Sequence, residues 1–149
     1  MDKKYKIISL DIARANDSFS SMNNQVHDIS SISEILLRCL KDKGTIYLCG
    51  NGGSAADSQH IAAEFTGRFL KERESVPAIS LTTNTSVITA IGNDYGYDKV
   101  SFTGHDPSPL SLMADFSYNA PSLDTPRIQE CHILCLHTIC NAIEQGLFK

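Results

Sequence analysis

A glycine-rich loop is the first candidate site for chemistry. The loop runs Gly50-Asn51-Gly52-Gly53-Ser54, between a short apolar run and a stretch with helical periodicity. Glycines let a backbone approach a ligand closely, and the N–H groups at a helix N-terminus attract an anion. Ser54 adds a hydroxyl donor for a phosphate oxygen. We therefore predict a phosphate site here, and the alternative is a tight turn that uses glycine only for its geometry.

A nucleotide site is a weaker interpretation of the same loop. Gly50, Gly52 and Ala55 fit the G-x-G-x-x-G/A pattern of dinucleotide-binding proteins, which is a weak signal alone. That pattern needs a carboxylate after the next strand, but the apolar run 76–81 is followed by two threonines. The loop also lacks the GK[ST] of a P-loop. We therefore do not expect a nucleotide ligand.

Two side chains beyond the loop are suited to proton transfer or metal binding. His60 and Glu64 are four residues apart, so they project from one face of the predicted helix. An imidazole and a carboxylate beside a bound phosphate are typical of acid–base or metal sites. Without the neighbouring loop, the pair would be read as a solvated contact on a helix surface.

The last helix carries further polar side chains. Gln129 and His137 are eight positions apart, roughly 12 Å along a straight helix, so one metal would bind both only with long side chains, a bend or a second subunit. Taken alone, His132 and His137 are read as ordinary surface or core histidines. The pair Asn93-Asp94 suits either sugar hydroxyls or a turn, and the sequence leaves both open.

These residues must be positioned by alternating strands and helices. Hydrophobic periodicity predicts, in chain order, helices over Ile8–Phe19 and Ile29–Leu40, a strand over Thr45–Cys49, a helix after the glycine loop, a strand over Val76–Leu81, a helix over Ser86–Ile91, a strand over Asp115–Ala120 and a helix over Ile128–Leu147. In the last helix, Pro126 suits the first position, Asp124 or Thr125 could cap it, and the apolar stripe is Ile128, Cys131, Cys135, Thr138 and Ala142. This order predicts a parallel sheet covered by helices in one domain of 149 residues.

Composition excludes several classes of partner. The net charge of −4 offers no basic field for nucleic acid or anionic lipid, so we expect neither as a partner. No stretch approaches the ~20 apolar residues of a membrane span, and no signal peptide is recognisable, which predicts a cytoplasmic protein. The cysteines, Cys39, Cys49, Cys131, Cys135 and Cys140, are odd in number without a disulfide or metal spacing, so we expect reduced core thiols.

Three segments resemble the bacterial phosphoheptose isomerases of the sugar-isomerase (SIS) domain family. They are CGNGGSAADSQHIAAEF at 49–65, AISLTTNTSVITAIGNDYGYD at 78–98 and LDTPRIQECHILCLH at 123–137. The resemblance implies a flavodoxin-like α/β three-layer sandwich over residues 1–149, with N-terminal helices in 1–43. It also implies conversion of sedoheptulose 7-phosphate to D-glycero-D-manno-heptose 7-phosphate through an enediol, for lipopolysaccharide or capsule. The alternative is a non-catalytic SIS module that binds a sugar phosphate or a protein.

The same resemblance implies roles for individual residues. Glu64 would be the base and His137 the acid, within a zinc site, one per subunit, formed by His60, Glu64, Gln129 and His137. Substrate contacts would come from Asn51, Gly52, Gly53, Ser54, Glu64, Asn93, Asp94 and Gln129. Non-enzymatic relatives lack the Glu and His of the cluster, so their presence here predicts an enzyme. The resemblance further implies a homotetramer with active sites between subunits.

The chain departs from this family after Phe102. Family members continue there with a strand, a serine-rich S-T-S-G-N-S phosphate loop, a helix and a strand that ends in Thr-Gly. Here Phe102 is followed directly by Thr103-Gly104. We therefore predict an internal deletion of a strand–helix–strand unit, roughly 30 residues or more, that removes two strands and the serines that grip the phosphate.

Overall fold

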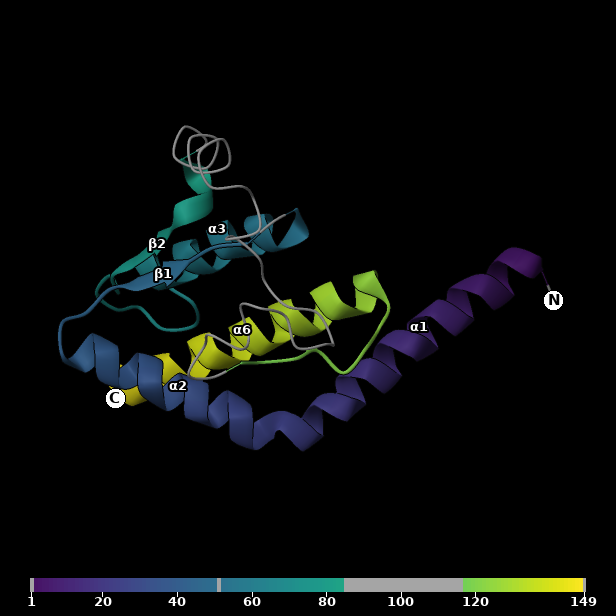
Figure 1. The fold of residues 1–149 in the computed structure, drawn as a ribbon, viewed down its shortest axis with the longest axis horizontal. Helices are drawn as coiled ribbons and strands as arrows, with labels where there is room; N and C mark the ends of the chain where they lie inside the picture. The colour runs from purple at the N-terminus through teal and green to yellow at the C-terminus, as the bar shows by residue number, and fades with distance from the viewer. Residues whose placement is uncertain (1, 51, 85–116, 149) are drawn as a thin grey trace.

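The N-terminal part of the chain is helical, as predicted. The computed structural model describes residues 2–50, 52–84 and 117–148. Helix α1 (Lys3–Ser21) begins after Asp2, whose side chain accepts the Lys4 N–H at 3.2 Å. A 3-10 turn, η1 (Met22–Gln25), joins it to α2 (Val26–Lys41). Figure 1 shows α1 in purple, extending away from the other elements. Among the described residues, no helix is both long and apolar enough to cross a bilayer.

Two parallel strands flank the first crossover helix. Strand β1 (Ile46–Leu48) pairs with β2 (Ala78–Ser80), with Ile46 opposite Ala78. Helix α3 (Gly53–Thr66) connects them, and the turn η2 (Leu81–Thr83) follows β2. Both strands lie within the predicted runs but are shorter. The parallel pairing joined by a helix confirms the α/β prediction.

The C-terminal helix α6 (Thr125–Leu147) forms the centre of the core. It packs against both α2 and α3 (Figure 1). Its buried face carries residues at successive intervals of four, Cys131, Cys135, Ile139 and Ile143. Complete burial of an isoleucine such as Ile143 contributes about 2 kcal/mol.

The apolar stripe predicted to form the buried face of α6 is correct only in its first half. Thr138 and Ala142 are exposed rather than buried. The prediction followed a period of 3.5 residues, but a straight helix has 3.6, so the buried face drifts towards Ile139 and Ile143. Asp124 stands at the N-cap but its side chain makes no capping bond, and Pro126 is the second residue of the helix rather than the first, which is Thr125.

The predicted strand over Asp115–Ala120 is wrong for its described residues. Residues 117–120 are in no helix or strand. The Asn119 carbonyl accepts the side-chain N–H of Gln25 at 2.6 Å, and Ala120 is completely buried. The apolar pattern therefore reflects contact with the core rather than strand pairing. The predicted helix over Ser86–Ile91 and the junction after Phe102 lie outside the described residues.

All five cysteines are free thiols. Cys131, Cys135 and Cys140 are buried, which confirms the expected core position, but Cys39 and Cys49 are only half-buried. Burial raises the pKa of Cys135, and likewise that of Cys140, to about 12, so both are protonated at neutral pH.

Candidate functional site

The glycine loop joins β1 directly to the N-terminus of α3. Gly52 has φ 54° and ψ −122°, a conformation that side chains with a Cβ rarely adopt. A Cβ at Gly50 would lie 2.5 Å from the Ser54 carbonyl oxygen, so only glycine fits there. Ser54 lies half-buried in the first turn of α3. This geometry places a helix N-terminus beside a closely approachable backbone, as an anion site requires.

Gln129 of α6 lies against this loop. A Cβ built on Gly53 would lie 2.6 Å from Gln129 Nε2, so the amide occupies the space that a side chain at Gly53 would fill. Packing of α6 on α3 thus brings together Gln129 and Gly53, two residues that were predicted to contact the substrate. His60 lies seven residues further along α3, roughly 10 Å away along the axis.

A compact cluster lies towards the C-terminal end of α3 and consists of His60, Glu64 and His137. The Nε2 atoms of His60 and His137 are 3.0 Å apart, and His60 Nε2 lies 3.5 Å from Glu64 Oε1. The helical spacing of α3 brings the first two together, and α6 supplies the third. One ligand atom from each residue lies within 4.8 Å of the others. Two imidazoles and one carboxylate form a ligand set typical of catalytic zinc sites.

Known proteins with similar sequences and structures point to one family. Residues 12–118 match the SIS domain family. A phosphoheptose isomerase of Aliarcobacter butzleri is 40% identical over an alignment of 161 positions, gaps included, which covers 80% of this chain and 85% of that protein. The phosphoheptose isomerase of Aquifex aeolicus is 35% identical over 187 residues, 97% of each chain. The solved structure of phosphoheptose isomerase GmhA from Neisseria gonorrhoeae has a TM-score of 0.82 at 31% identity, covering 96% of this chain and all of that one.

The chain belongs to the phosphoheptose isomerases. This membership confirms the resemblance, the SIS fold and the expectation of an enzyme. The alignment with the Aquifex aeolicus relative extends over 187 residues although this chain has 149, so that relative contains residues without a counterpart here. Such a difference agrees with the predicted internal deletion.

The structure brings together only some of the predicted site residues. Gln129 lies beside Gly53, whereas His137 lies with His60 and Glu64. Within one chain, Gln129 and His137 are therefore as far apart along α6 as their spacing in the sequence predicts. The roles of these residues stay predictions. Three further predicted substrate contacts, Asn51, Asn93 and Asp94, lie outside the described residues.

Two residues beside the cluster, Phe69 and Asp57, are not among those predicted from the sequence. The Phe69 ring stacks on the His137 ring, with centroids 5.5 Å apart and planes at 24°. Asp57 lies on α3 one turn before His60; burial raises its pKa, and the nearby imidazoles of His132, His60 and His137 partly oppose the shift. The three-residue spacing could have indicated Asp57. No local pattern could have indicated Phe69, since its contact depends on the packing of α6.

Proposed function

We propose that the chain isomerises sedoheptulose 7-phosphate to D-glycero-D-manno-heptose 7-phosphate. The observation that carries this proposal is that His137 of α6 lies beside Glu64 of α3, the helix that begins at the glycine loop. Family membership supports the substrate, because the relatives are named phosphoheptose isomerases. The product would supply heptose for lipopolysaccharide or capsule, in the cytoplasm.

Glu64 and His137 divide the proton transfers of this reaction. Glu64 takes the proton from C1 of the open-chain ketose while His137 donates a proton to the C2 oxygen, which produces an enediol. Return of a proton to C2 and loss of the O1 proton then form the aldehyde. Glu64 is half-buried, and its Oε1 atom lies 3.5 Å from His60 Nε2, a contact that restrains the carboxylate.

A zinc ion, one per subunit, fits the chemistry of the cluster. His60, Glu64 and His137 would hold it through one atom each, which would leave the second carboxylate oxygen of Glu64 and the second ring nitrogen of His137 for proton transfer. Zinc would supply Lewis-acid polarisation of the substrate carbonyl. Gln129 is the fourth ligand that the family resemblance implies. Since Gln129 of the same chain lies against Gly53, that ligand would come from a neighbouring subunit or from a bend in α6.

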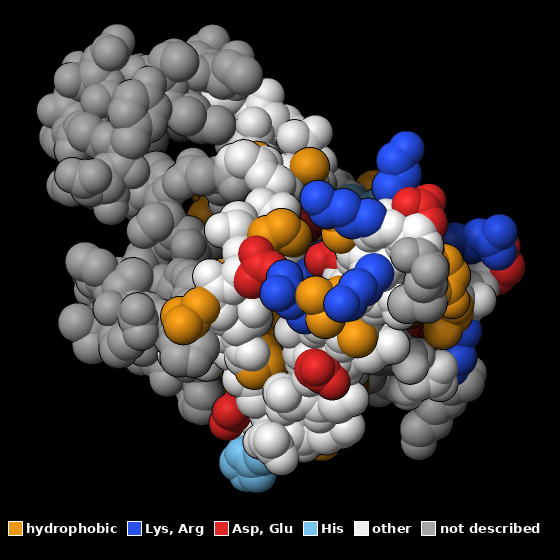
Figure 2. Space-filling model, turned by 90° about the vertical axis from the view of Figure 1, so that its right-hand side faces the viewer, with side chains coloured by type: hydrophobic (Ala, Val, Ile, Leu, Met, Phe, Trp, Pro, Cys, Tyr) orange, Lys and Arg blue, Asp and Glu red, His pale blue; other side chains and the backbone are white. Residues whose placement is uncertain are grey.

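A homotetramer would account for two exposed apolar surfaces. Helix α1 exposes more than half of several large apolar side chains, namely Tyr5, Ile7, Ile8, Leu10 and Ile12. Figure 2, viewed from the side towards which α1 extends, shows orange apolar side chains among blue lysines and arginines. A groove of about 280 Å³ between α2 and α6 is lined by Val26, Ile29, Ser30, Ser33, Glu34, Leu37, Thr138 and Ala142. Contiguous exposed apolar side chains of this kind often mark protein–protein interfaces.

A non-catalytic SIS module is the weaker candidate, since the similar proteins are named phosphoheptose isomerases. The observation that favours it is the predicted loss of the serine-rich phosphate loop after Phe102. For the same reason we expect the 149-residue chain to turn over much more slowly than relatives that contain this loop.

Replacement of Glu64 tests the proposed function. We expect Glu64→Gln to lower product formation by about 10³-fold, because general base catalysis typically contributes 10²–10⁴-fold. The assay incubates the purified chain with sedoheptulose 7-phosphate and zinc and measures heptose 7-phosphate by chromatography with mass detection. Glu72→Gln is the matched control, since Glu72 is exposed and its carboxylate pairs with the likewise exposed Arg68.

Two outcomes would count against the enzyme. An unchanged rate in Glu64→Gln would refute the role of Glu64. A parent chain that binds the sugar phosphate without any turnover would instead establish the non-catalytic module.

A further inference from the structure

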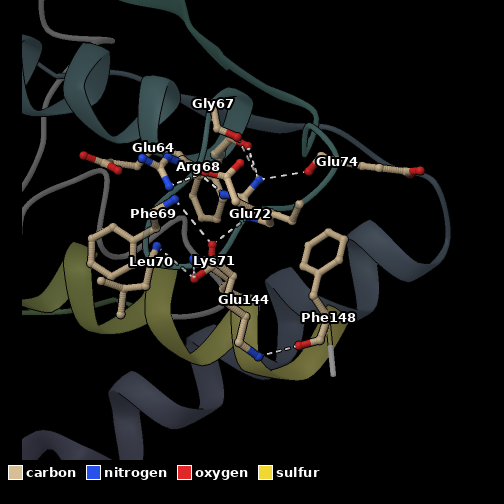
Figure 3. Close-up of polar contacts among 12 residues, drawn as sticks. Glu64, Gly67, Arg68, Phe69, Leu70, Lys71, Glu72, Glu74, Glu144 and Phe148 are labelled. Carbon is tan, nitrogen blue, oxygen red and sulfur yellow. Dashed lines mark hydrogen bonds and ion pairs between the residues drawn. The ribbon is translucent and has the colours of Figure 1, made fainter.

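A buried ion pair ties the segment after α3 to the last turns of α6 (Figure 3). The side chains of Arg73 and Glu144 are each only 2% exposed, and Arg73 Nε donates to Glu144 Oε1 at 2.7 Å. The same carboxylate accepts backbone N–H groups from the turn: Phe69 at 3.3 Å, Leu70 at 3.0 Å and Lys71 at 2.9 Å. One side chain of α6 therefore fixes the backbone of residues 69–71.

Arg73 completes the other half of this connection. Its guanidinium donates to the carbonyl oxygens of Glu64 at 2.7 Å, Phe65 at 2.9 Å, Gly67 at 3.3 Å and Glu74 at 3.0 Å. The last carbonyls of a helix lack partners within it, and a cation there also complements the helix dipole. Arg73 thus holds the end of the helix that carries His60 and Glu64.

The carboxylate is ionised in this setting. Burial by itself would raise the pKa of Glu144, but the hydrogen bonds from Arg73 and from the three backbone N–H groups lower it below its usual value. Breaking either side of the pair would therefore leave a buried charge without its counter-charge.

The connection reaches the candidate site through Phe69. Glu144 lies seven residues after His137, and a spacing of seven places both on the same face of α6. Glu144 accepts the N–H of Phe69, and the Phe69 ring stacks on the His137 ring at 5.5 Å. Such a separation is favourable for aromatic pairs. The edge of His137 then faces His60 at 3.0 Å between their Nε2 atoms.

We propose that Glu144 and Arg73 position the His137 imidazole through Phe69. The ion pair and its hydrogen bonds fix the turn after α3 to α6, and the fixed turn holds the Phe69 ring in contact with one face of the His137 ring. The imidazole is thereby held with Nε2 directed at His60 and Glu64. Glu144, Arg73 and Phe69 are positioning residues, and this inference rests on the proposed function of the cluster.

Phe69→Leu is the variant that tests this role. Removing the ring frees His137 to rotate, so we expect zinc affinity to fall by about tenfold or more, as with other residues that orient metal ligands. Affinity is measured by competition with a chromophoric chelator, and thermal unfolding is recorded alongside. Phe69→Tyr keeps the stacked ring and should retain parental affinity. Leu70→Ala is the matched control, because Leu70 is 64% exposed and its backbone N–H still bonds Glu144.

A second readout does not depend on zinc. In the metal-free protein, the ring current of Phe69 shifts the His137 ring protons, so Phe69→Leu should move these NMR signals while Leu70→Ala should not. A Phe69→Leu variant that binds zinc as tightly as Leu70→Ala would overturn the proposal. If the parent bound no zinc, the metal part of the proposed function would fail, and unchanged His137 ring signals in Phe69→Leu would then overturn the positioning role as well.

Discussion

Replacing Glu144 by glutamine should strongly destabilise the fold. The carboxylate accepts two donors on each oxygen: the Phe69 N–H and Arg73 Nε on Oε1, and the Leu70 and Lys71 N–H groups on Oε2. An isosteric amide in either orientation places its NH₂ group opposite one of these pairs. Glu144→Gln therefore leaves two buried donors without an acceptor and Arg73 without its counter-charge.

The expected loss is about 4 kcal/mol in the free energy of unfolding. Each buried donor left unsatisfied costs about 1–3 kcal/mol, and removal of one member of a buried ion pair costs about 3–5 kcal/mol. For a domain of this size, that loss lowers the thermal midpoint by about 10 °C. Glu72→Gln removes an exposed pairing with Arg68, so we expect a change below about 0.5 kcal/mol.

Urea unfolding followed by circular dichroism measures this difference, at one protein concentration for all variants because assembly changes apparent stability. The pH dependence has a definite sign. The pKa of Glu144 is lower in the folded chain than its ordinary value of 4.5, so its contribution is fully present above pH 4.5 and is lost as the pH falls through the folded pKa. The gap between the parent and Glu144→Gln should therefore be largest near pH 7 and shrink on acidification.

Either of two results would refute this reasoning. One is a Glu144→Gln variant as stable as Glu72→Gln at pH 7. The other is a stability gap that stays constant from pH 7 to the acid range.

Two further predictions concern the thiols and the assembly. Because burial raises the pKa of Cys135 and Cys140 to about 12, iodoacetamide at pH 8 should label Cys39 and Cys49 first, and peptide mass spectrometry showing early labelling of Cys135 would contradict this. Ile8, 59% exposed on α1, should contribute to the subunit interface, so Ile8→Asp should shift the native mass spectrum from tetramer to smaller assemblies. A parent that is monomeric in that experiment would refute the assembly.

Local features of the site were predictable because they depend on neighbours in the chain. The 3.6-residue period of a helix places His60 and Glu64 on one face wherever α3 packs. The glycines between an apolar run and a helix likewise predict the close backbone turn, which the φ of Gly52 confirms. Resemblance to a family, rather than periodicity, supplied the predictions of the substrate and of the metal.

The strand expected over Asp115–Ala120 shows where local patterns mislead. A short apolar run is compatible with strand pairing or with simple burial. At residues 117–120 the neighbouring partner is the Gln25 side chain rather than a strand, so the backbone there joins no described sheet.

By itself, the sequence determined the helices, the glycine turn and the pairing of His60 with Glu64, since these follow from steric preferences and spacing within a few residues. Only the tertiary structure decided which residues of α6 lie beside α3 and the turn that follows it. His137 contacts His60, 77 positions earlier in the chain, and Gln129 lies against Gly53. Glu144 accepts the N–H of Phe69 in the turn after α3. The physical reason is that contacts between α3 and α6 depend on how two buried faces interlock. Spacing along either helix does not determine that arrangement.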